Sequence, residues 1–562
     1  MAEVPIIRTC KWLGGATLGA LLLASVPATA AVRVASDDPA LTYLQARAAA
    51  MDGDHARAAT LLAGLAEAQP GQADLARKAL SEAIEAGRMD LALQLAQQMP
   101  AARLTNDARL LLAAEELRDG RDDRAVAWLA PTGASGGLDF LAPLVRAWAS
   151  ADSGDMAGAL RVLAAMPANS PLGPMSDEQR AFILLKFRRT ADAAPIAQQA
   201  AASAGARESR LRLAYADGFL AAGDEARALA ILQGIGAGTL PASEQIRARK
   251  RNGSVIDTGA KAFSETLVAF AGEVAKLQHA APPLGLVQVA RYADPRNSSA
   301  TILLAQVFES DDQPEPALAA LRAIPDGDPL APRARDVQVR ILANEKRYAD
   351  AYALAAPLAL RPDATIDDFT RLGDVYSAMK RQNDAANAYG RAVALAQSQG
   401  LKDELWPLLL VEAGSLEQAK RWPEAQSAVE QALKIAPEQP LLLNFLGYTE
   451  LVRGQNVQAA EAMIRKASEL APDDASITDS LGWAEFKRGK VADAIATLQR
   501  AAEKDPEQAE IQEHLGDALF SNGDHLEARF AWNAALVTAD DDVAARIKAK
   551  LASGLAPGNA AP

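Results

Sequence analysis

The feature that most constrains this chain is a residue pattern that returns at a nearly constant spacing. In the second half, an alanine recurs at intervals of 34, 34, 40, 35, 34 and 34 residues, and a second small or aliphatic residue follows each of them seven positions later. A period of this length is typical of arrays in which each unit is a helical hairpin that buries its apolar face only against its neighbours. The recurring alanines are Ala317, Ala351, Ala385, Ala425, Ala460, Ala494 and Ala528.

The first half of the chain carries the same register in its turns. Five glycines, at intervals of 34, 33, 34 and 69 residues, are each followed five positions later by an alanine, and Arg189 with Ala194 fills the double interval. A glycine at this place supplies the left-handed residue that ends the first helix of a hairpin. The sequence therefore predicts an all-α array of about fourteen hairpins, with turns near residues 53, 87, 120, 154, 189, 223, 278, 312, 346, 381, 421, 454, 489 and 523.

Three segments near the end of the array carry a more specific pattern. Residues 443–448 are LNFLGY, residues 479–483 are DSLGW, and residues 514–517 are HLGD. With the alanines and with prolines that close three units, this pattern resembles the tetratricopeptide repeat (TPR), and residues 262–540 are similar in layout to a family of exported bacterial TPR proteins. The resemblance implies a right-handed superhelix that binds protein segments and has no known catalytic chemistry. Between the signal segment and residue 261, the chain resembles TPR proteins only in general.

The resemblance also implies where a partner binds. In TPR proteins, certain positions of the first helix of each hairpin tend to face the concave side of the superhelix. Aromatic anchors there give affinity, and polar groups align the bound backbone. An alternative stays open, in which Trp483 or Phe486 packs between repeats. In the last three repeats of this chain, the predicted groove residues are Leu441, Asn444, Tyr448, Leu451, Asp479, Trp483, Phe486, Asp517 and Phe520.

One well-understood TPR chemistry does not fit these helices. The clamp of lysine, asparagine and arginine that grips a C-terminal carboxylate is missing at the matching positions. Acidic residues occupy three of them, namely Asp479, Glu513 and Asp517. We expect these three acids to repel a carboxylate.

Residues 1–30 are predicted to be a cleavable signal peptide. Arg8 and Lys11 precede an apolar stretch at 13–26, and residues 28–30 offer a small-residue cleavage site. The stretch has 14 residues, whereas about 20 are needed to span a bilayer. Because Cys10 is the only cysteine, the mature chain would hold no disulfide, no thiol nucleophile and no cysteine ligand for zinc. We therefore expect export to the periplasm.

The mature chain is predicted to divide into two arrays, at residues 31–233 and 261–540. Residues 234–260 hold more chain than the repeat requires, and they include Gly234, Gly236, Gly238 and a basic run that ends at Arg251. We interpret this segment as an irregular linker and hinge with room for one extra helix. A docking site for an acidic partner is the alternative.

Residues 541–562 are predicted to form a capping helix and a short disordered tail. An apolar stripe at i, i+4 and i+8 begins at Val543 and is expected to face the last repeat. The basic residues Arg546, Lys548 and Lys550 are expected to face water.

The remaining chemistry excludes several classes of function. The formal net charge is −13, from 58 basic and 71 acidic residues, which disfavours nucleic acid as a partner. The four histidines include no pair at i+3 or i+4, so no metal site is predicted. A G-x-S-x-G match at 133–137 and an S-x-x-K match at 377–380 lack the structural context that nucleophilic catalysis requires. No catalytic residue and no cofactor is predicted.

The sequence thus favours a non-catalytic interaction scaffold or adaptor of the bacterial cell envelope that binds envelope proteins. Peripheral association with a membrane is compatible with this function, and the oligomeric state stays open. One alternative is a structural subunit of a polysaccharide or pilus export machine. Another is an enzyme that uses a carboxylate pair such as Asp479 and Asp517.

Overall fold

The computed structural model describes residues 38–131, 137–167, 170–233, 240–250, 255–278, 280–362 and 364–561. The predicted signal peptide and the serine of the G-x-S-x-G match lie outside these residues. Every regular element in the described ranges is a helix, which confirms the predicted all-α fold. None of the helices in these ranges is long and apolar enough to cross a membrane. Residues 38–354 and 355–561 belong to two separate compact units, and each is described by itself.

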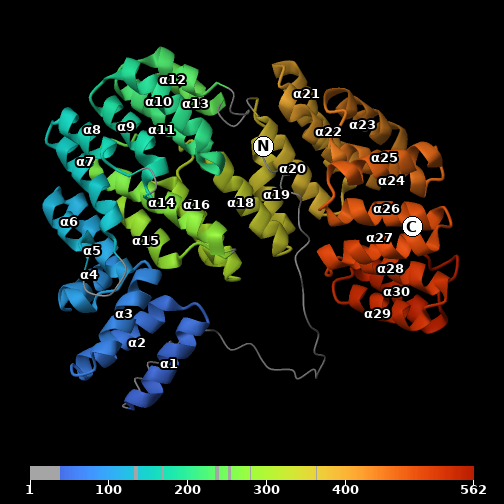
Figure 1. Ribbon diagram of the computed structural model, residues 1–562, viewed down its shortest axis with the longest axis horizontal. Coiled ribbons are helices and arrows are strands. Elements are labelled where there is room, and N and C mark those ends of the chain that lie inside the picture. Colours follow the sequence, from blue (N-terminus) through green and yellow to red (C-terminus); the bar gives the residue numbers. More distant parts are fainter. Residues whose placement is uncertain are drawn as a thin grey trace. The chain divides into compact units, whose positions relative to one another are not determined.

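The first unit begins with six consecutive helical hairpins (Figure 1). We call the first helix of each hairpin its A helix and the second its B helix. The six pairs are α1 (Pro39–Met51) with α2 (His55–Ala68), α3 (Ala73–Glu85) with α4 (Met89–Gln97), α5 (Asn106–Arg118) with α6 (Asp122–Leu129), α7 (Ala142–Asp152) with α8 (Met156–Ala164), α9 (Ser176–Lys186) with α10 (Thr190–Ser203), and α11 (Glu208–Ala221) with α12 (Glu225–Ile231). Short 3-10 turns lead into four A helices, at Ala101–Arg103, Asp139–Leu141, Gly173–Met175 and Gly205–Arg207.

The rest of the first unit continues the array after one additional helix. This helix, α13 (Leu240–Arg247), falls in the segment where the sequence left room for it. The following helices are α14 (Gly259–Gln278), α15 (Leu284–Ala293), α16 (Ser298–Ser310), α17 (Pro314–Arg322) and α18 (Ala331–Asn344). Helix α19 (Tyr348–Ala359) contains the boundary between the two units.

The second unit contains five further hairpins and a final helix. The hairpins are α20 (Ile366–Ala378) with α21 (Gln382–Gln399), α22 (Lys402–Gln418) with α23 (Trp422–Ile435), α24 (Pro440–Val452) with α25 (Val457–Leu470), α26 (Ala475–Lys487) with α27 (Val491–Lys504), and α28 (Ala509–Asn522) with α29 (His525–Ala535). Helix α30 (Asp541–Ser553) follows them as the predicted cap.

The turns between A and B helices confirm the register of the repeat. Thirteen of the fourteen predicted turns contain a described residue with positive φ, and residue 279 in the remaining turn lies outside the described residues. The left-handed residues are Gly53, Gly87, Gly120, Gly154, Arg188, Gly223, Asp312, Lys346, Lys380, Lys420, Gly454, Gly489 and Gly523. Five of these are not glycine and adopt a conformation that costs roughly 1–2 kcal/mol for an ordinary residue. The period therefore locates a turn even where glycine is absent.

Small residues set the distance between the helices of a hairpin. All seven recurring alanines have no exposed surface. On the A helices, a Cβ added at Gly516 would lie 2.3 Å from Cδ1 of Trp532, and one at Gly482 would lie 2.7 Å from Cγ of Leu498. A Cβ at Gly414 would meet nothing within 4 Å. The two helices of a hairpin therefore approach closely at Gly482 and Gly516, as they do at Gly373 and Gly447, but not at Gly414.

Candidate protein-binding surface

The predicted groove residues lie on three A helices of the second unit, α24, α26 and α28. We call the surface formed by these three helices the A-helix face. Each A helix packs its glycine side against its own B helix, so the predicted residues lie on other sides of these helices. Leu441, Asn444, Tyr448, Phe486 and Phe520 are partly exposed. Leu451, Asp479, Trp483 and Asp517 are buried.

Trp483 is packed between neighbouring repeats. It has no exposed surface, and its ring stacks on His514 of α28 at a centroid distance of 4.1 Å and on Phe486 at 4.9 Å. The Nζ atom of Lys487 lies 4.7 Å from the same ring centroid. Trp483 therefore joins α26 to α28 and offers no surface to a partner, as in the alternative that the sequence left open. Phe486 stays partly exposed beside it.

Asp479 is paired with a histidine of the next repeat. Nδ1 of His514 lies 2.9 Å and 3.0 Å from the two carboxylate oxygens of Asp479. Burial lowers the pKa of His514, because it disfavours the charged imidazole. The charge of Asp479 and the hydrogen bond to it outweigh burial, so the pKa of His514 is raised overall. The pair is a second link between α26 and α28.

The acids of α28 are neutralised by the capping helix α30. Nζ of Lys550 lies 2.6 Å from Oε1 of Glu513 and 2.7 Å from Oδ1 of Asp517. Arg546 donates to both oxygens of Glu513 at 2.7 Å, and Trp532 donates its indole N–H to Asp517. Burial raises the pKa of Glu513, but the hydrogen bonds from Arg546 and Lys550 outweigh it and hold that pKa below its usual range.

This arrangement corrects two expectations from the sequence. Lys548 faces water, but Lys550 is fully buried and Arg546 is partly buried. The apolar stripe of α30 predicts that its lysines face water. Two buried acids on the adjacent helix α28 require nearby cations, however, and Lys550 is one of these cations. The expected repulsion of a carboxylate also loses its basis, because each of the three acids has a basic partner, namely His514 for Asp479 and Lys550 for both Glu513 and Asp517.

The end of the chain lies against α28, where the sequence predicts a disordered tail. The backbone N–H of Ala561 donates to Oδ2 of Asp517 at 2.9 Å, and Asn559 donates to the carbonyl of Gly554. Ala561 is only 3% exposed. Lys550 contacts both carboxylate oxygens of Asp517, and the backbone N–H of the tail adds a further hydrogen bond to Oδ2. Residues 554–561 thus cover part of the A-helix face at α28.

The exposed remainder of the face lies on α24 and α26. We call Asn444, Tyr448, Phe486 and Lys487 the α24–α26 patch, since all four are partly or fully exposed. The Oδ1 atom of Asn444 is shielded from solvent and has no hydrogen-bond partner. Burial, followed by the charges of Asp479 and nearby glutamates, raises the pKa of Tyr448, so its hydroxyl stays protonated and able to donate. The patch offers aromatic surface, an amide, a hydroxyl and one cation.

In the first unit, the inner face of the A helices is filled by the chain itself. An extended stretch, residues 255–258, leads into α14 and contacts three A helices in turn. The N–H of Val255 donates to Asp217 of α11 at 3.0 Å, and Lys186 of α9 donates to the carbonyl of Asp257 at 2.7 Å. The N–H of Gly259 donates to Asp152 of α7 at 3.2 Å.

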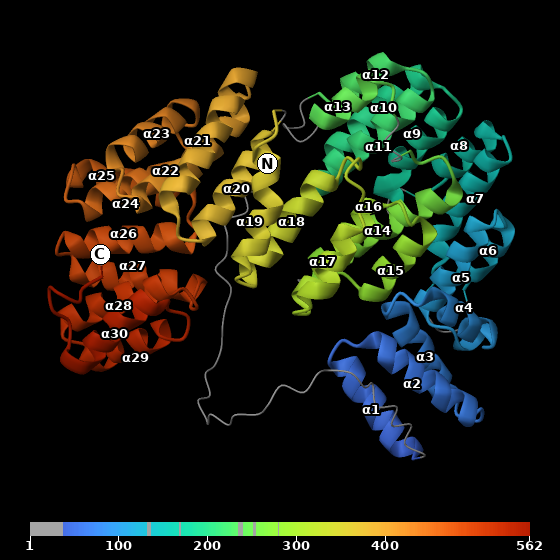
Figure 2. The same ribbon diagram turned by 180° about the vertical axis from the view of Figure 1, so that it is seen from behind.

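Helix α15 continues this contact toward the start of the array. Figures 1 and 2 both show α14 and α15 inside the arc formed by α3 to α12. The hydroxyl of Tyr292 donates to Glu115 of α5, and Arg118 of α5 donates to the carbonyl of Tyr292. Gln288 donates to the carbonyl of Glu85 of α3 at 3.0 Å. Residues 255–278 and 280–293 therefore supply contacts to the A helices α3, α5, α7, α9 and α11.

Two segments of the second unit match a known family model. Residues 410–475 and 480–544 match the tetratricopeptide repeat. These TPR segments contain α24, α25, α27, α28 and α29 complete and most of α26, and they include every predicted groove residue except Asp479. No curated protein sequence matches the chain.

Solved structures of TPR-type proteins are also similar to this chain. The Cut9–Hcn1 hetero-tetramer of the APC/C has 13% identity, covering 93% of this chain and 97% of that one, with a TM-score of 0.38. A TPR protein from Parabacteroides merdae has 16% identity over 45% of this chain and 96% of its own length, with a TM-score of 0.37. Yeast Tom70 has 10% identity over 92% and 95%, with a TM-score of 0.37.

Proposed function

We propose that this chain is a non-catalytic scaffold of the bacterial cell envelope that binds a segment of another envelope protein at the α24–α26 patch. The unpaired Oδ1 of Asn444 beside the partly exposed Tyr448 carries the proposal. A buried acceptor without a partner costs about 1–3 kcal/mol. A backbone N–H of a bound segment offsets that cost once the amide of Asn444 turns toward it.

The distribution of free surface supports the same site. In the first unit, residues 255–278 and 280–293 already pack against the inner face of the A helices. In the second unit, the tail covers part of α28, whereas Tyr448 and Phe486 keep exposed aromatic surface. Because Asp479 and Glu513 already have basic partners, the patch suits an apolar segment whose backbone supplies hydrogen bonds. Placement in the periplasm rests on the predicted signal peptide, and a mature chain that starts at Ala31 by mass spectrometry would support it.

The alternatives differ from this proposal in measurable ways. A structural subunit of a polysaccharide or pilus export machine would self-associate, which its mass in solution would reveal. An enzyme built on Asp479 and Asp517 has less support, because His514 and Lys550 hold these carboxylates in buried pairs. The TPR fold is itself typical of non-catalytic scaffolds.

The proposal is tested by crosslinking from within the patch. Trp483 is unsuitable as a crosslinking position because it is buried, so a photoreactive phenylalanine replaces Phe486 or Tyr448. The matched control is Phe530, which is 68% exposed on the B helix α29. We expect one envelope protein to be captured at both patch positions and not at Phe530.

Affinity measurements with the captured protein complete the test. We expect Tyr448→Ala and Phe486→Ala each to weaken binding by about tenfold or more, as for aromatic anchors of interfaces. Phe530→Ala should leave the affinity unchanged. Equal capture at all three positions, or unchanged affinity in both patch variants, would contradict the proposal.

A further inference from the structure

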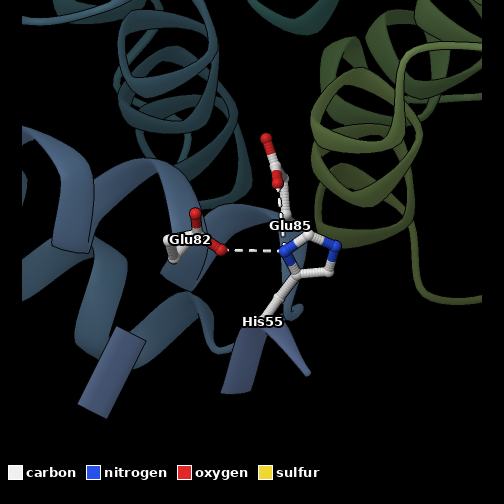
Figure 3. Close-up of side chains that lie close together, drawn as sticks. All are labelled: His55, Glu82 and Glu85. Carbon is white, nitrogen blue, oxygen red and sulfur yellow. Dashed lines mark hydrogen bonds and ion pairs between the residues drawn. The ribbon is translucent and has the colours of Figure 1, made fainter. Parts of the chain in front are cut away.

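One histidine and two glutamates that the proposed function does not use converge at the start of α2 and the end of α3 (Figure 3). Nδ1 of His55 lies 2.8 Å from Oε2 of Glu82 and 3.2 Å from Oε2 of Glu85. Each of the three side chains offers a metal-ligand atom, and these atoms all lie within 4.8 Å of one another. The cluster belongs to the first unit and lies on different helices from the α24–α26 patch.

The three residues are held by regular helices. His55 is the first residue of α2, and the N-cap residue Asp54 fixes this helix start by accepting a hydrogen bond from the N–H of Arg57. Glu82 and Glu85 lie three residues apart on α3, so their side chains leave the same face of that helix. A ligand set on packed helices is more precisely placed than one on loops.

We propose that His55, Glu82 and Glu85 bind a divalent transition-metal ion, with zinc as the best fit. Zinc binds histidine nitrogen and carboxylate oxygen at about 2.0–2.2 Å, so neighbouring ligands of a tetrahedral site lie roughly 3.3–3.5 Å apart. The distances of 2.8 Å and 3.2 Å from His55 to the two carboxylates come close to that spacing, and small side-chain movements suffice. A mixed nitrogen and oxygen set favours zinc or a related metal over calcium and magnesium.

The surroundings suit a cation with one open coordination position. The side chains of His55 and Glu82 are 17% and 18% exposed, and that of Glu85 is 33% exposed, which leaves a path for the ion. The carboxylates of Asp107 and Asp311 interact electrostatically with Glu85 and His55 and add to the attraction. Three protein ligands leave a fourth position for water. The ion would join the first hairpin to the second.

The test is zinc binding by the full mature chain after removal of metals with a chelator. We expect one zinc ion per chain by calorimetry and by elemental analysis after dialysis. His55→Ala should abolish this binding, and Glu82→Gln and Glu85→Gln should each weaken it at least tenfold. The matched control is His525→Ala, whose histidine packs against Phe520 in the second unit and should leave zinc uptake unchanged.

Two results would overturn the proposal. One is the absence of saturable binding at micromolar zinc, which would leave His55 as an ion-pair partner of the two glutamates. The other is uptake that persists in His55→Ala, which would place the zinc elsewhere on the surface. Cobalt(II) supplies an independent readout, because its visible spectrum distinguishes a four-coordinate site from hydrated ion. Circular dichroism verifies that each variant is folded. If His55→Ala is misfolded, Glu85→Gln replaces it as the deciding variant, because the side chain of Glu85 is one-third exposed.

Discussion

At the scale of single residues, Lys550 is the charge on which the last hairpin most depends. Its ammonium group contacts both Glu513 and Asp517, and all three side chains are almost completely buried. Lys550→Met removes the cation and leaves two buried acids with fewer partners, so we expect a loss of about 3–5 kcal/mol in the free energy of unfolding. Urea unfolding followed by circular dichroism measures this loss.

The neighbouring lysine is the matched control for that experiment. Lys548 lies two residues earlier on the same helix and is exposed. Lys548→Met should change the free energy of unfolding by no more than about 0.5 kcal/mol. Equal effects of the two substitutions would show that the buried pairing of Lys550 does not hold in solution.

The pair of His514 and Asp479 predicts a dependence of stability on pH. The pKa of His514 is raised in the folded chain, and an unfolded histidine titrates near 6.5. The stabilising contribution of this pair is therefore fully present below about pH 6.5 and is lost as the pH rises through the folded pKa. We expect the native chain to lose more stability than Asp479→Asn between pH 6 and pH 9, measured by urea unfolding. Parallel pH profiles would contradict the prediction.

The residue scale also shows how much of the candidate site the sequence indicates. The TPR resemblance predicts that Asn444, Tyr448 and Phe486 face a partner; all three are partly exposed, and their role in binding stays a prediction. It does not reveal that Asp479 and His514 are partners, although their spacing of one repeat plus one residue offered a signal. The spacing of the histidines also gave no sign of the His55 cluster. Ligands that come from two hairpins do not form a histidine pair within one helix.

At the scale of helices, replacing glycine by alanine at two positions of the A helices should have opposite effects on stability. In Gly516→Ala the new methyl group would lie 2.3 Å from the ring of Trp532, which is fully buried, so we expect a loss of about 1–3 kcal/mol through overpacking. In Gly414→Ala the methyl group meets nothing within 4 Å, and alanine favours a helix interior by about 1 kcal/mol. Thermal unfolding should therefore shift downward for the first variant and upward for the second. Shifts of the same sign would contradict this reading of the hairpin contacts.

Helix positions were the most predictable part of the fold. The period located turns at Lys346, Lys380 and Lys420, where no glycine marks them, because helix length and packing repeat even when the turn residue changes. The orientation of α30 was less predictable. Its apolar stripe is confirmed, since Ile547 is buried and Val543 packs beside it. The burial of Lys550 depends on acids 33 and 37 residues earlier, which the helix's own pattern does not contain.

At the scale of the whole molecule, the sequence predicts a succession of hairpins but not the return of one segment onto earlier ones. Residues 255–278 and 280–293 contact A helices from α11 back to α3, and such contacts have no periodic signature. Residues on both sides of segment 234–260 belong to one compact unit. Hinge motion at that segment stays a prediction, as does the boundary drawn there from sequence.

The filled inner face of the first unit has a consequence for how the chain folds. Ordinary repeat arrays contain only contacts between neighbours, and folding can begin anywhere and spread. Here Gln288 must reach Glu85 across 203 residues, and contacts of such long range slow folding. At synthesis rates of roughly 5–20 residues per second, the early hairpins wait some 10–40 seconds for α15 to emerge. Through that interval, their inner apolar surface is open to whichever chaperone accompanies the growing chain.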